Sequence, residues 1–441
     1  RNMANGSPND RCGFKADYSS EVMLEEFGTL MGAGDVTCWR PVWREHDKCI
    51  WHADVDKKPA DELANARTGL PERLDYSKLR KVDVTDDLSF SECNLRNSDM
   101  SQSDFKHVDF SRANLSMAEL NGTDVARADF SDAELSSAKL IDSKVIRADF
   151  DQADMSYANF SKANAAKSSF CDAYLRRGIF KDSYLSEADF AGANLTDAEF
   201  GEARAKDAIF VGANLEEANL VRTDLRGADL TDSRLYNAYF SDIRMNTATK
   251  FGSVSPYDGF GKLEDWDSSH TEASVWTYRR LQSLHEEHSQ NHKAREYHIK
   301  RSEAQKRLYR NKGEWFNYIV SVFNGAITEY GENPWRVIQT SLATILIWSI
   351  LYYFLGRIHI TNIPERGALI GFGLFPNGIA PSCLSEFLLS VYFSAVTFST
   401  LGLGDAQPAS DLTLALTAVE SFLGVLLMSL LVFVLGRQTR M

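Results

Sequence analysis

Large apolar side chains recur at every fifth position through the middle of the chain, from Phe90 to Met245, without an insertion. Only Ala165 and Ala205 interrupt the series, and a small residue usually stands two positions before each member. A period of five fits neither the 3.6 residues of a helical turn nor the two-residue alternation of a strand. An array whose every unit supplies one large and one small inward side chain predicts a solenoid core of stacked coils.

The five-residue units resemble the pentapeptide-repeat family, whose pattern is A-[DN]-[LF]-x-x. Examples are ADFSD at 128–132, ANLTD at 193–197 and ADLTD at 228–232. The resemblance implies a right-handed quadrilateral β-helix with four units per coil, which we assign to residues 87–247. Some members of this family act as DNA mimics toward topoisomerases. The alternative is a rigid spacer or docking surface, which the well-mixed charge signs along the array favour.

Helical patterns follow the repeats. Residues 248–311 have apolar side chains at helical spacing and a break near Ser289, which predicts a helical hairpin linker. His285, His288 and His292 would share one face of an unbroken helix and suggest a metal or pH sensor, but the break favours a solvated, charged surface. Within residues 312–333, the segment 313–327 is apolar but too short to cross a bilayer, and its Trp315 and Tyr318 suit the membrane interface, so we expect an interfacial helix at 312–333.

Two segments near the C-terminus have the length and composition of membrane spans. We expect an outer transmembrane helix at 334–356 and an inner one at 411–436. The apolar segment 384–398 between them is too short to cross. A chain that enters the membrane there must return to the same side, so 384–410 is predicted to be a re-entrant pore helix and filter. This part is then an all-α two-span pore domain.

The segment TFSTLGLGD, residues 397–405, begins in the last turn of this re-entrant helix and continues beyond it. Gly402 and Gly404 can adopt a positive φ, which lets consecutive carbonyls turn the same way. A row of carbonyls with the Thr400 hydroxyl can replace the water shell of a cation when four copies surround one axis.

At these residues the chain resembles the tetrameric potassium channels, whose pattern is T-x-x-T-V-G-Y-G-D. The resemblance implies a homotetramer with potassium ions in the filter, Thr397 on the pore helix and a gating hinge at Gly424. The implied filter residues are Thr400, Leu401, Gly402, Leu403, Gly404 and Asp405. Leu401 and Leu403 replace the usual valine and tyrosine, which leaves a weakly selective cation channel as the alternative.

Two features of the inner helix bear on gating. Val425, Met428 and Val432 lie at i, i+3 and i+7, so they either line the inner pore or pack against helices or lipid. Glu420 is an intramembrane acid, and such a group usually faces the bundle or the pore.

Basic residues set the expected orientation. They precede the first span and follow the second, while the loop between the spans carries few, so both termini should be cytoplasmic in a multi-pass protein of the cell membrane, of prokaryotic type. Residues 357–383 then form an extracellular turret, in which Cys383 is either unpaired or paired between subunits.

The N-terminal residues 1–60 contain a candidate metal site, followed by a linker at 61–86. Cys49 and His52 form a C-x-x-H pair, and Cys12 and Cys38 supply two more thiols. Cytosolic thiols stay reduced, so these four residues could form a Cys3His zinc site. The alternative is buried cysteines without a ligand.

Composition excludes some functions. The 441-residue chain has a formal net charge of -13, so we expect no nucleic-acid partner. The sequence shows no catalytic constellation, and we expect no enzyme. The sequence predicts a tetrameric potassium channel in the lipid bilayer, with a cytosolic repeat rod that regulates gating or binds an unknown ligand or protein. A membrane-anchored interaction scaffold is the competing hypothesis.

Overall fold

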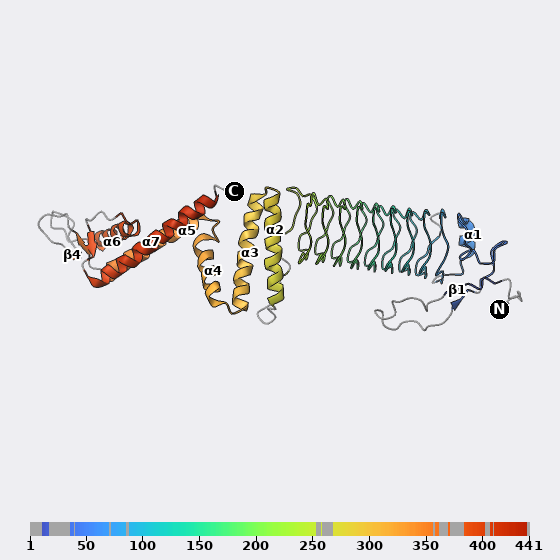
Figure 1. The fold of residues 1–441 in the computed structure, drawn as a ribbon, viewed down its shortest axis with the longest axis horizontal. Helices are drawn as coiled ribbons and strands as arrows, with labels where there is room; N and C mark the ends of the chain where they lie inside the picture. The colour runs from blue at the N-terminus through green and yellow to red at the C-terminus, as the bar shows by residue number, and fades with distance from the viewer. Residues whose placement is uncertain are drawn as a thin grey trace. The chain divides into compact units, whose positions relative to one another are not determined.

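The computed structural model divides the chain into two compact units, Arg1–Gln290 and Asn291–Met441, and each is described by itself (Figure 1). The described residues are 11–16, 36–38, 40–69, 72–84, 88–252, 257, 268–355, 358–360, 369–370, 383–401, 406–408 and 410–438.

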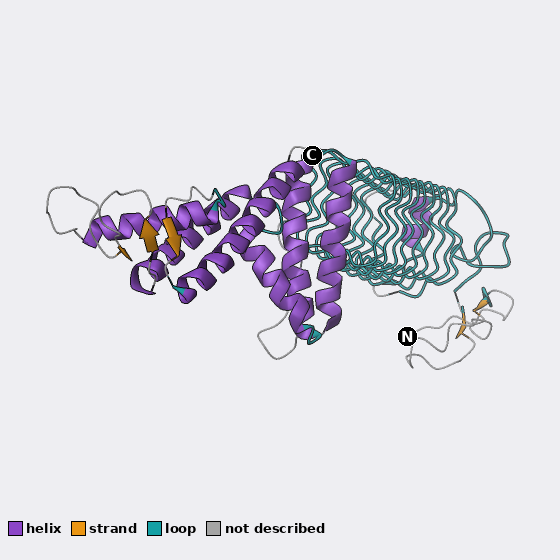
Figure 2. Cartoon of the chain, turned by 60° about the vertical axis from the view of Figure 1, so that its left-hand side comes forward, coloured by secondary structure: helices purple, strands orange, loops and turns teal. Residues whose placement is uncertain are grey.

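The first unit is dominated by a stack of coils (Figure 2). Asp109 forms a parallel bridge with Asp129, and Asp129 forms the next with Asp149. Beside the first bridge, the Phe110 N–H donates to the carbonyl of Asp129 at 2.7 Å. Because pairing recurs every 20 residues, four five-residue units complete one coil. The predicted β-helix is confirmed.

Phenylalanine ladders fill the core of the stack. Phe150, Phe170 and Phe190 are fully buried. The Phe170 ring stacks on Phe150 at 5.0 Å and on Phe190 at 4.7 Å, with 3° between the planes in both pairs. A second ladder meets the first edge-on, as Phe170 and Phe180 do at 5.9 Å and 86°. The five-residue spacing therefore places like side chains directly above one another in successive coils.

Each corner of a coil contains a residue with left-handed backbone. Asp132 and Asp142, with φ of 57° and 56°, are examples at such positions, which aspartate and asparagine tolerate. At Gly192, a Cβ would overlap the carboxylate of Asp172, so a side chain there would require that carboxylate to turn away. Side chains brace the turns, as when Oδ1 of Asp129 accepts from the Ser131 N–H at 2.9 Å.

The array is longer than predicted. Arg73, Lys78 and Asp83 form bridges with residues 21 positions later, and so does Asp229 with Lys250. Residues 72–84 therefore add coil structure within the segment that the sequence assigned to the linker 61–86. The last coil likewise extends beyond residue 247. One extra residue near each end of the array interrupts the period of five, but the coils still stack.

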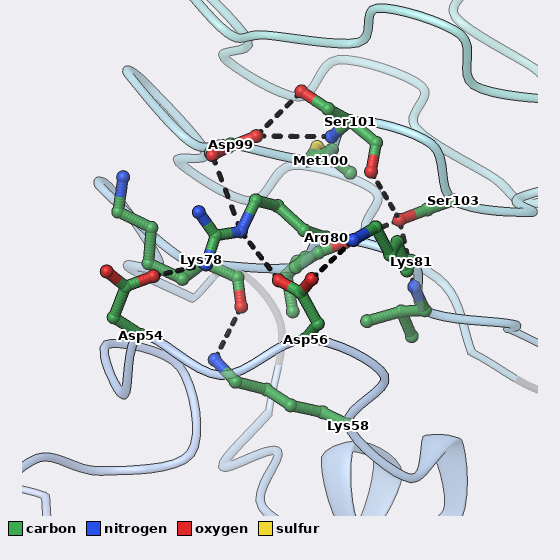
Figure 3. Close-up of polar contacts among 12 residues, drawn as sticks. Asp54, Asp56, Lys58, Lys78, Arg80, Lys81, Asp99, Met100, Ser101 and Ser103 are labelled. Carbon is green, nitrogen blue, oxygen red and sulfur yellow. Dashed lines mark hydrogen bonds and ion pairs between the residues drawn. The ribbon is translucent and has the colours of Figure 1, made fainter.

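A small N-terminal segment packs on the first coil. It contains β1 (Lys15–Ala16), which pairs antiparallel with β2 (Val36–Thr37), and α1 (Ala60–Asn65). Figure 3 shows its charged contacts with the rod: Arg80 of the rod bonds to Asp54 and lies 2.9 Å from Asp56, and within the rod it lies 3.8 Å from Asp99.

At the other end, α2 (Ser268–Glu287) covers the last coil. The His288 Nε2 atom lies 3.1 Å from the carbonyl of Ile243, and Trp276 packs edge-on against Tyr236 at 5.8 Å. His285 is fully buried. The expectation of a solvated surface is therefore wrong for His285, because this face of α2 packs against the rod.

The second unit contains five helices among its described residues: α3 (Asn291–Asn311), α4 (Trp315–Thr328), α5 (Pro334–Leu355), α6 (Cys383–Phe398) and α7 (Asp411–Gln438). α3 packs on α4, α4 on α5, and α5, α6 and α7 on one another. The predicted break at Ser289 is present, with φ of 56°. The two arms of the predicted hairpin, α2 and α3, belong to different units.

Candidate functional site

Two helices in the described part of the chain are long and apolar enough to cross a membrane. They are Pro334–Phe354 within α5, of mean hydropathy 1.6, and Asp411–Arg437 within α7, of mean hydropathy 2.4. Pro334 suits the first turn of α5, since proline lacks the N–H that is unpaired there anyway. α6 has 16 residues, too few to cross, and packs against both long helices.

A buried carboxylate joins these three helices. Glu420 on α7 is fully buried, accepts from the Tyr352 hydroxyl of α5 at 2.8 Å and also accepts from the Ser394 hydroxyl of α6. The Ser394 oxygen lies 3.0 Å from the Ile345 carbonyl of α5 as well. A buried carboxylate is costly unless hydrogen-bonded, so this cluster fixes the position of the short helix. The sequence singled out Glu420 but not its partners.

Gly424 lies where α6 ends. A Cβ at this position would overlap the carbonyl oxygen of Phe398 and lie 2.9 Å from its carbonyl carbon. One turn away, the Ser421 hydroxyl donates to the carbonyl of Thr397 at 3.4 Å. The absence of a side chain at Gly424 is therefore a packing requirement, whatever its role in bending the helix.

The predicted filter follows α6 directly. Thr397 lies in the last turn of α6, while Thr400 is exposed with φ of 55°, and Leu401 is 67 % exposed. Gly402, Leu403, Gly404 and Asp405 lie outside the described residues, as does the side chain of Cys383.

A small antiparallel sheet brackets this segment. β5 (Ala406–Pro408) begins directly after Asp405 and pairs with β3 (Ile358–Ile360), which follows α5 and also pairs with β4 (Leu369–Ile370). In its register, His359 lies opposite Gln407. The chain just beyond the predicted filter is thus tied to the chain just beyond the outer helix, a connection that the sequence did not reveal.

The candidate pore-lining residues lie on the exposed side of α7. The exposed fractions of Val425, Met428 and Val432 are 54 %, 48 % and 71 %. The opposite side of the helix, with Leu427 and Val434, is buried against the other helices. The three side chains are thus available to a pore axis, a neighbouring subunit or lipid.

A cluster of charges connects α3, the α4–α5 turn and the end of α7. The Glu332 side chain is 5 % exposed and lies 2.9 Å from the Arg437 guanidinium. Arg295 and His298, on α3, each lie 3.8 Å from the same carboxylate. We call Arg295, His298, Glu332 and Arg437 the junction cluster. It links α3 to the last turn of α7.

A second contact strengthens this link between α3 and the turn. The Tyr330 hydroxyl donates to Glu303 at 2.7 Å, and Lys306 forms an ion pair with the same carboxylate. Burial alone would raise the pKa of Glu303, but the hydrogen bonds from Lys306 and Tyr330 hold that pKa below its usual range. Glu303 is thus ionised and paired at neutral pH.

Away from the helices, the structure brings together the four predicted metal ligands. The ligand atoms of Cys12, Cys38, Cys49 and His52 all lie within 4.8 Å of one another.

Comparison with known families agrees with this architecture. Residues 89–125, 128–170, 168–204 and 208–246 match the pentapeptide repeats, in 8 copies, and residues 340–441 match the ion channel family. The matches and the two apolar helices define a membrane protein with an ion channel domain. The chain is a fusion of pentapeptide repeats with this C-terminal ion channel domain.

Solved structures similar to the chain include other pentapeptide-repeat proteins. HetL from the cyanobacterium Nostoc, involved in heterocyst differentiation regulation, is 25 % identical over 42 % of this chain and 92 % of its own, with a TM-score of 0.26. QnrB1, a plasmid-mediated fluoroquinolone resistance protein, is 18 % identical over 40 % and 88 %, with a TM-score of 0.26. A protein of the Arabidopsis thaliana thylakoid lumen is 27 % identical over 23 % and 68 %, with a TM-score of 0.17. No curated protein matches the chain.

Proposed function

We propose that the chain is the subunit of a homotetrameric, potassium-selective channel. One observation carries the proposal: α6 is too short to cross a membrane, is held between two spans by Glu420, and ends at Phe398, two positions before Thr400-Leu401-Gly402-Leu403-Gly404-Asp405. A glycine-containing segment at the end of a re-entrant helix suits a row of backbone carbonyls that replaces the water shell of a cation.

The tetramer follows from the number of oxygens that a dehydrated cation needs. One strand offers too few carbonyls, whereas four strands around an axis form complete rings. The exposed apolar side chains of the spans support this assembly, since both lipid and neighbouring subunits must cover them. Six of these side chains are 44–75 % exposed: Leu346, Ile350 and Phe354 on α5, and Phe422, Leu426 and Phe433 on α7.

The repeats and α3 belong to the cytosolic side in this proposal, and the β3–β5 sheet to the extracellular side. Basic residues near both ends of the pore domain, including Arg336 and Arg437, support this orientation. α4 suits the membrane interface, because its Trp315, Phe316 and Phe323 are exposed. In this proposal, a cytosolic ligand or protein that binds the rod affects gating through α3 and the junction cluster.

The test is the reversal potential of the purified full-length protein in planar bilayers, with potassium on one side and sodium on the other. A reversal potential near the potassium equilibrium value supports the proposal. A large current that reverses near zero means that Leu403 leaves the pore permeable to sodium. Gly402→Ala and Gly404→Ala should abolish the current, while Gly436→Ala should keep it, because a Cβ at Gly436 meets no atom within 4 Å.

The absence of current in every condition, with an intact tetramer and normal folding, would favour the membrane-anchored scaffold. In that case the double glycine variant would retain any binding that the rod performs.

A further inference from the structure

We propose that Cys12, Cys38, Cys49 and His52 bind a structural Zn²⁺ ion that holds the N-terminal segment on the first coil of the rod. The proposal is independent of ion conduction. It starts from the way the fold gathers these four residues, which the sequence scatters over 41 positions. Cys12 precedes β1, Cys38 follows β2, and the pairing of the two strands brings both thiols to Cys49 and His52.

The distances match the edges of a zinc tetrahedron. Cys38 Sγ lies 3.8 Å from Cys49 Sγ, and His52 Nδ1 lies 3.4 Å from Cys12 Sγ and 3.3 Å from Cys49 Sγ. Zinc bonds of about 2.3 Å to sulfur and about 2.0 Å to nitrogen require edges of about 3.8 Å between sulfurs and about 3.5 Å between sulfur and nitrogen. Three of the six edges thus have about the length that a tetrahedral zinc site requires, and all four ligand atoms lie within 4.8 Å of one another.

The environment of His52 prepares Nδ1 to be a ligand. Its Nε2 lies 3.0 Å from the backbone carbonyl of Asp75, which can only accept, so Nε2 carries the proton and Nδ1 presents its lone pair to the thiols. The imidazole also stacks on Phe14 at 4.3 Å with 13° between the rings. Metal-ligating histidines are typically oriented in this way by a second hydrogen bond.

The alternatives explain less of the arrangement. A disulfide needs a bond of about 2.0 Å, leaves the third thiol over and gives no role to the oriented imidazole. Three thiolates and one imidazole in a closed tetrahedron form a set typical of structural zinc, and the cluster leaves no position for a substrate. Cys12 and Cys49 are buried, which suits a structural ion.

The ion would act on the end of the rod. His52 bonds to Asp75 of the first coil, and the neighbouring Trp51 is fully buried with its ring edge-on to Phe90 at 6.3 Å. The carbonyl of Trp51 accepts from the Lys78 N–H at 2.7 Å, which continues the pairing of the coils onto the N-terminal segment. Solenoids need such capping segments, because an uncovered terminal coil exposes its apolar core.

The experiment measures metal in the full-length protein, purified in detergent with reduced thiols and without chelator. We expect about one zinc per chain by elemental analysis. Cys49→Ser and His52→Ala should lower the retained zinc at least tenfold after dialysis, whereas Cys171→Ser, a cysteine in the rod, should retain it. Co²⁺ in place of zinc should give the visible spectrum of a tetrahedral thiolate site.

A second variant, which replaces the lost ligand with another, distinguishes the loss of a zinc ligand from misfolding. His52→Cys supplies a fourth thiolate and should bind Co²⁺ tetrahedrally, although it loses the bond to Asp75. Removal of zinc from the wild type should speed hydrogen exchange at the Lys78 amide and leave the middle coils protected. Wild-type protein that binds neither zinc nor Co²⁺, a disulfide found by intact mass, or full zinc retention by Cys49→Ser would each overturn the proposal.

Discussion

Gly424 on the inner helix lies in direct contact with the backbone of Phe398, the last residue of the short helix, with no room for a Cβ between them. This contact sets the distance between the inner helix and the base of the predicted filter. It also places the candidate hinge against the helix that positions that filter.

We expect Gly424→Ala to abolish or strongly reduce the current, because the new methyl group would push the end of α6 away from α7. Backbone cannot yield as a flexible side chain does, so overpacking of about 1–3 kcal/mol is the expected cost. Single-channel recording and thermal unfolding in detergent measure the two effects. The matched control is Gly436→Ala on the same helix, where a Cβ meets no atom within 4 Å. Equal behaviour of both variants would contradict the packing role.

Glu420→Ala should destabilise the pore domain, because the buried hydroxyls of Tyr352 and Ser394 lose their acceptor. Each buried polar group left without a partner costs roughly 1–3 kcal/mol. Tyr352→Phe removes one bond together with its donor and should therefore cost less. The melting temperature of the purified protein in detergent compares the variants. A Glu420→Ala protein as stable as the wild type would show that the cluster does not hold α6.

Charge removal in the junction cluster should change gating without changing selectivity. Arg437→Gln leaves Glu332 with its contacts to α3 but uncouples the end of the inner helix. If the interaction free energy of the Arg437–Glu332 pair differs by about 1.4 kcal/mol between the open and closed states, its loss shifts the open–closed equilibrium tenfold. Single-channel recording measures open probability and reversal potential together. Arg336→Gln, which breaks the more exposed pair with Glu329, is the control. A shift in reversal potential instead would place Arg437 in the permeation path.

Within the rod, Phe170→Ala should cost about 3–5 kcal/mol, since the ring is fully buried and stacks on two neighbours. Tyr174→Ala, four residues later, removes a ring that is 57 % exposed and should change stability by less than about 0.5 kcal/mol. Chemical denaturation followed by circular dichroism distinguishes the two. Similar losses for both would mean that the ladders do not dominate the core.

The rod should lose stability in acid partly through Asp224. Its hydrogen bonds with Arg226, at 2.8 Å and 2.6 Å, hold the pKa of Asp224 below the usual value of 3.8. A carboxyl with a lowered pKa stabilises the fold above its unfolded pKa, and this contribution disappears as the pH falls through the folded pKa. Asp224→Asn should thus lower stability at pH 7 and flatten its dependence on pH below about 4. Asp232→Asn, at an exposed corner, is the control and should change stability at pH 7 by less than about 0.5 kcal/mol.

The period of five was sufficient to predict the β-helix, because every unit contributes to the core in the same way. Its first coil was missed, since one additional residue between Val84 and Phe90 shifts the register, although Asp83 still pairs with Asp104. A periodic pattern reports stacking only while the count of residues per coil is constant.

Side-chain partners that are distant in the sequence were harder to predict. Glu420 is conspicuous as an acid in an apolar helix, but its bond to Tyr352 spans 68 positions and has no local pattern. Glu332 carries no sequence signal at all, because its burial depends on how α3 and α7 meet the turn. Among the four proposed zinc ligands, only Cys49 and His52 have a spacing in the sequence typical of a metal site, and the pairing of β1 with β2 brings the other two to them.

The stacking of the coils also determines how the rod responds to tension. The hydrogen bonds between coils join each coil only to the ones before and after it. A pull on the two ends of the rod would therefore load a few of these bonds at a time, and coils would peel away in sequence from an end. Each coil of 20 residues could release about 70 Å of extended chain. The terminal caps would then set the force at which unravelling begins.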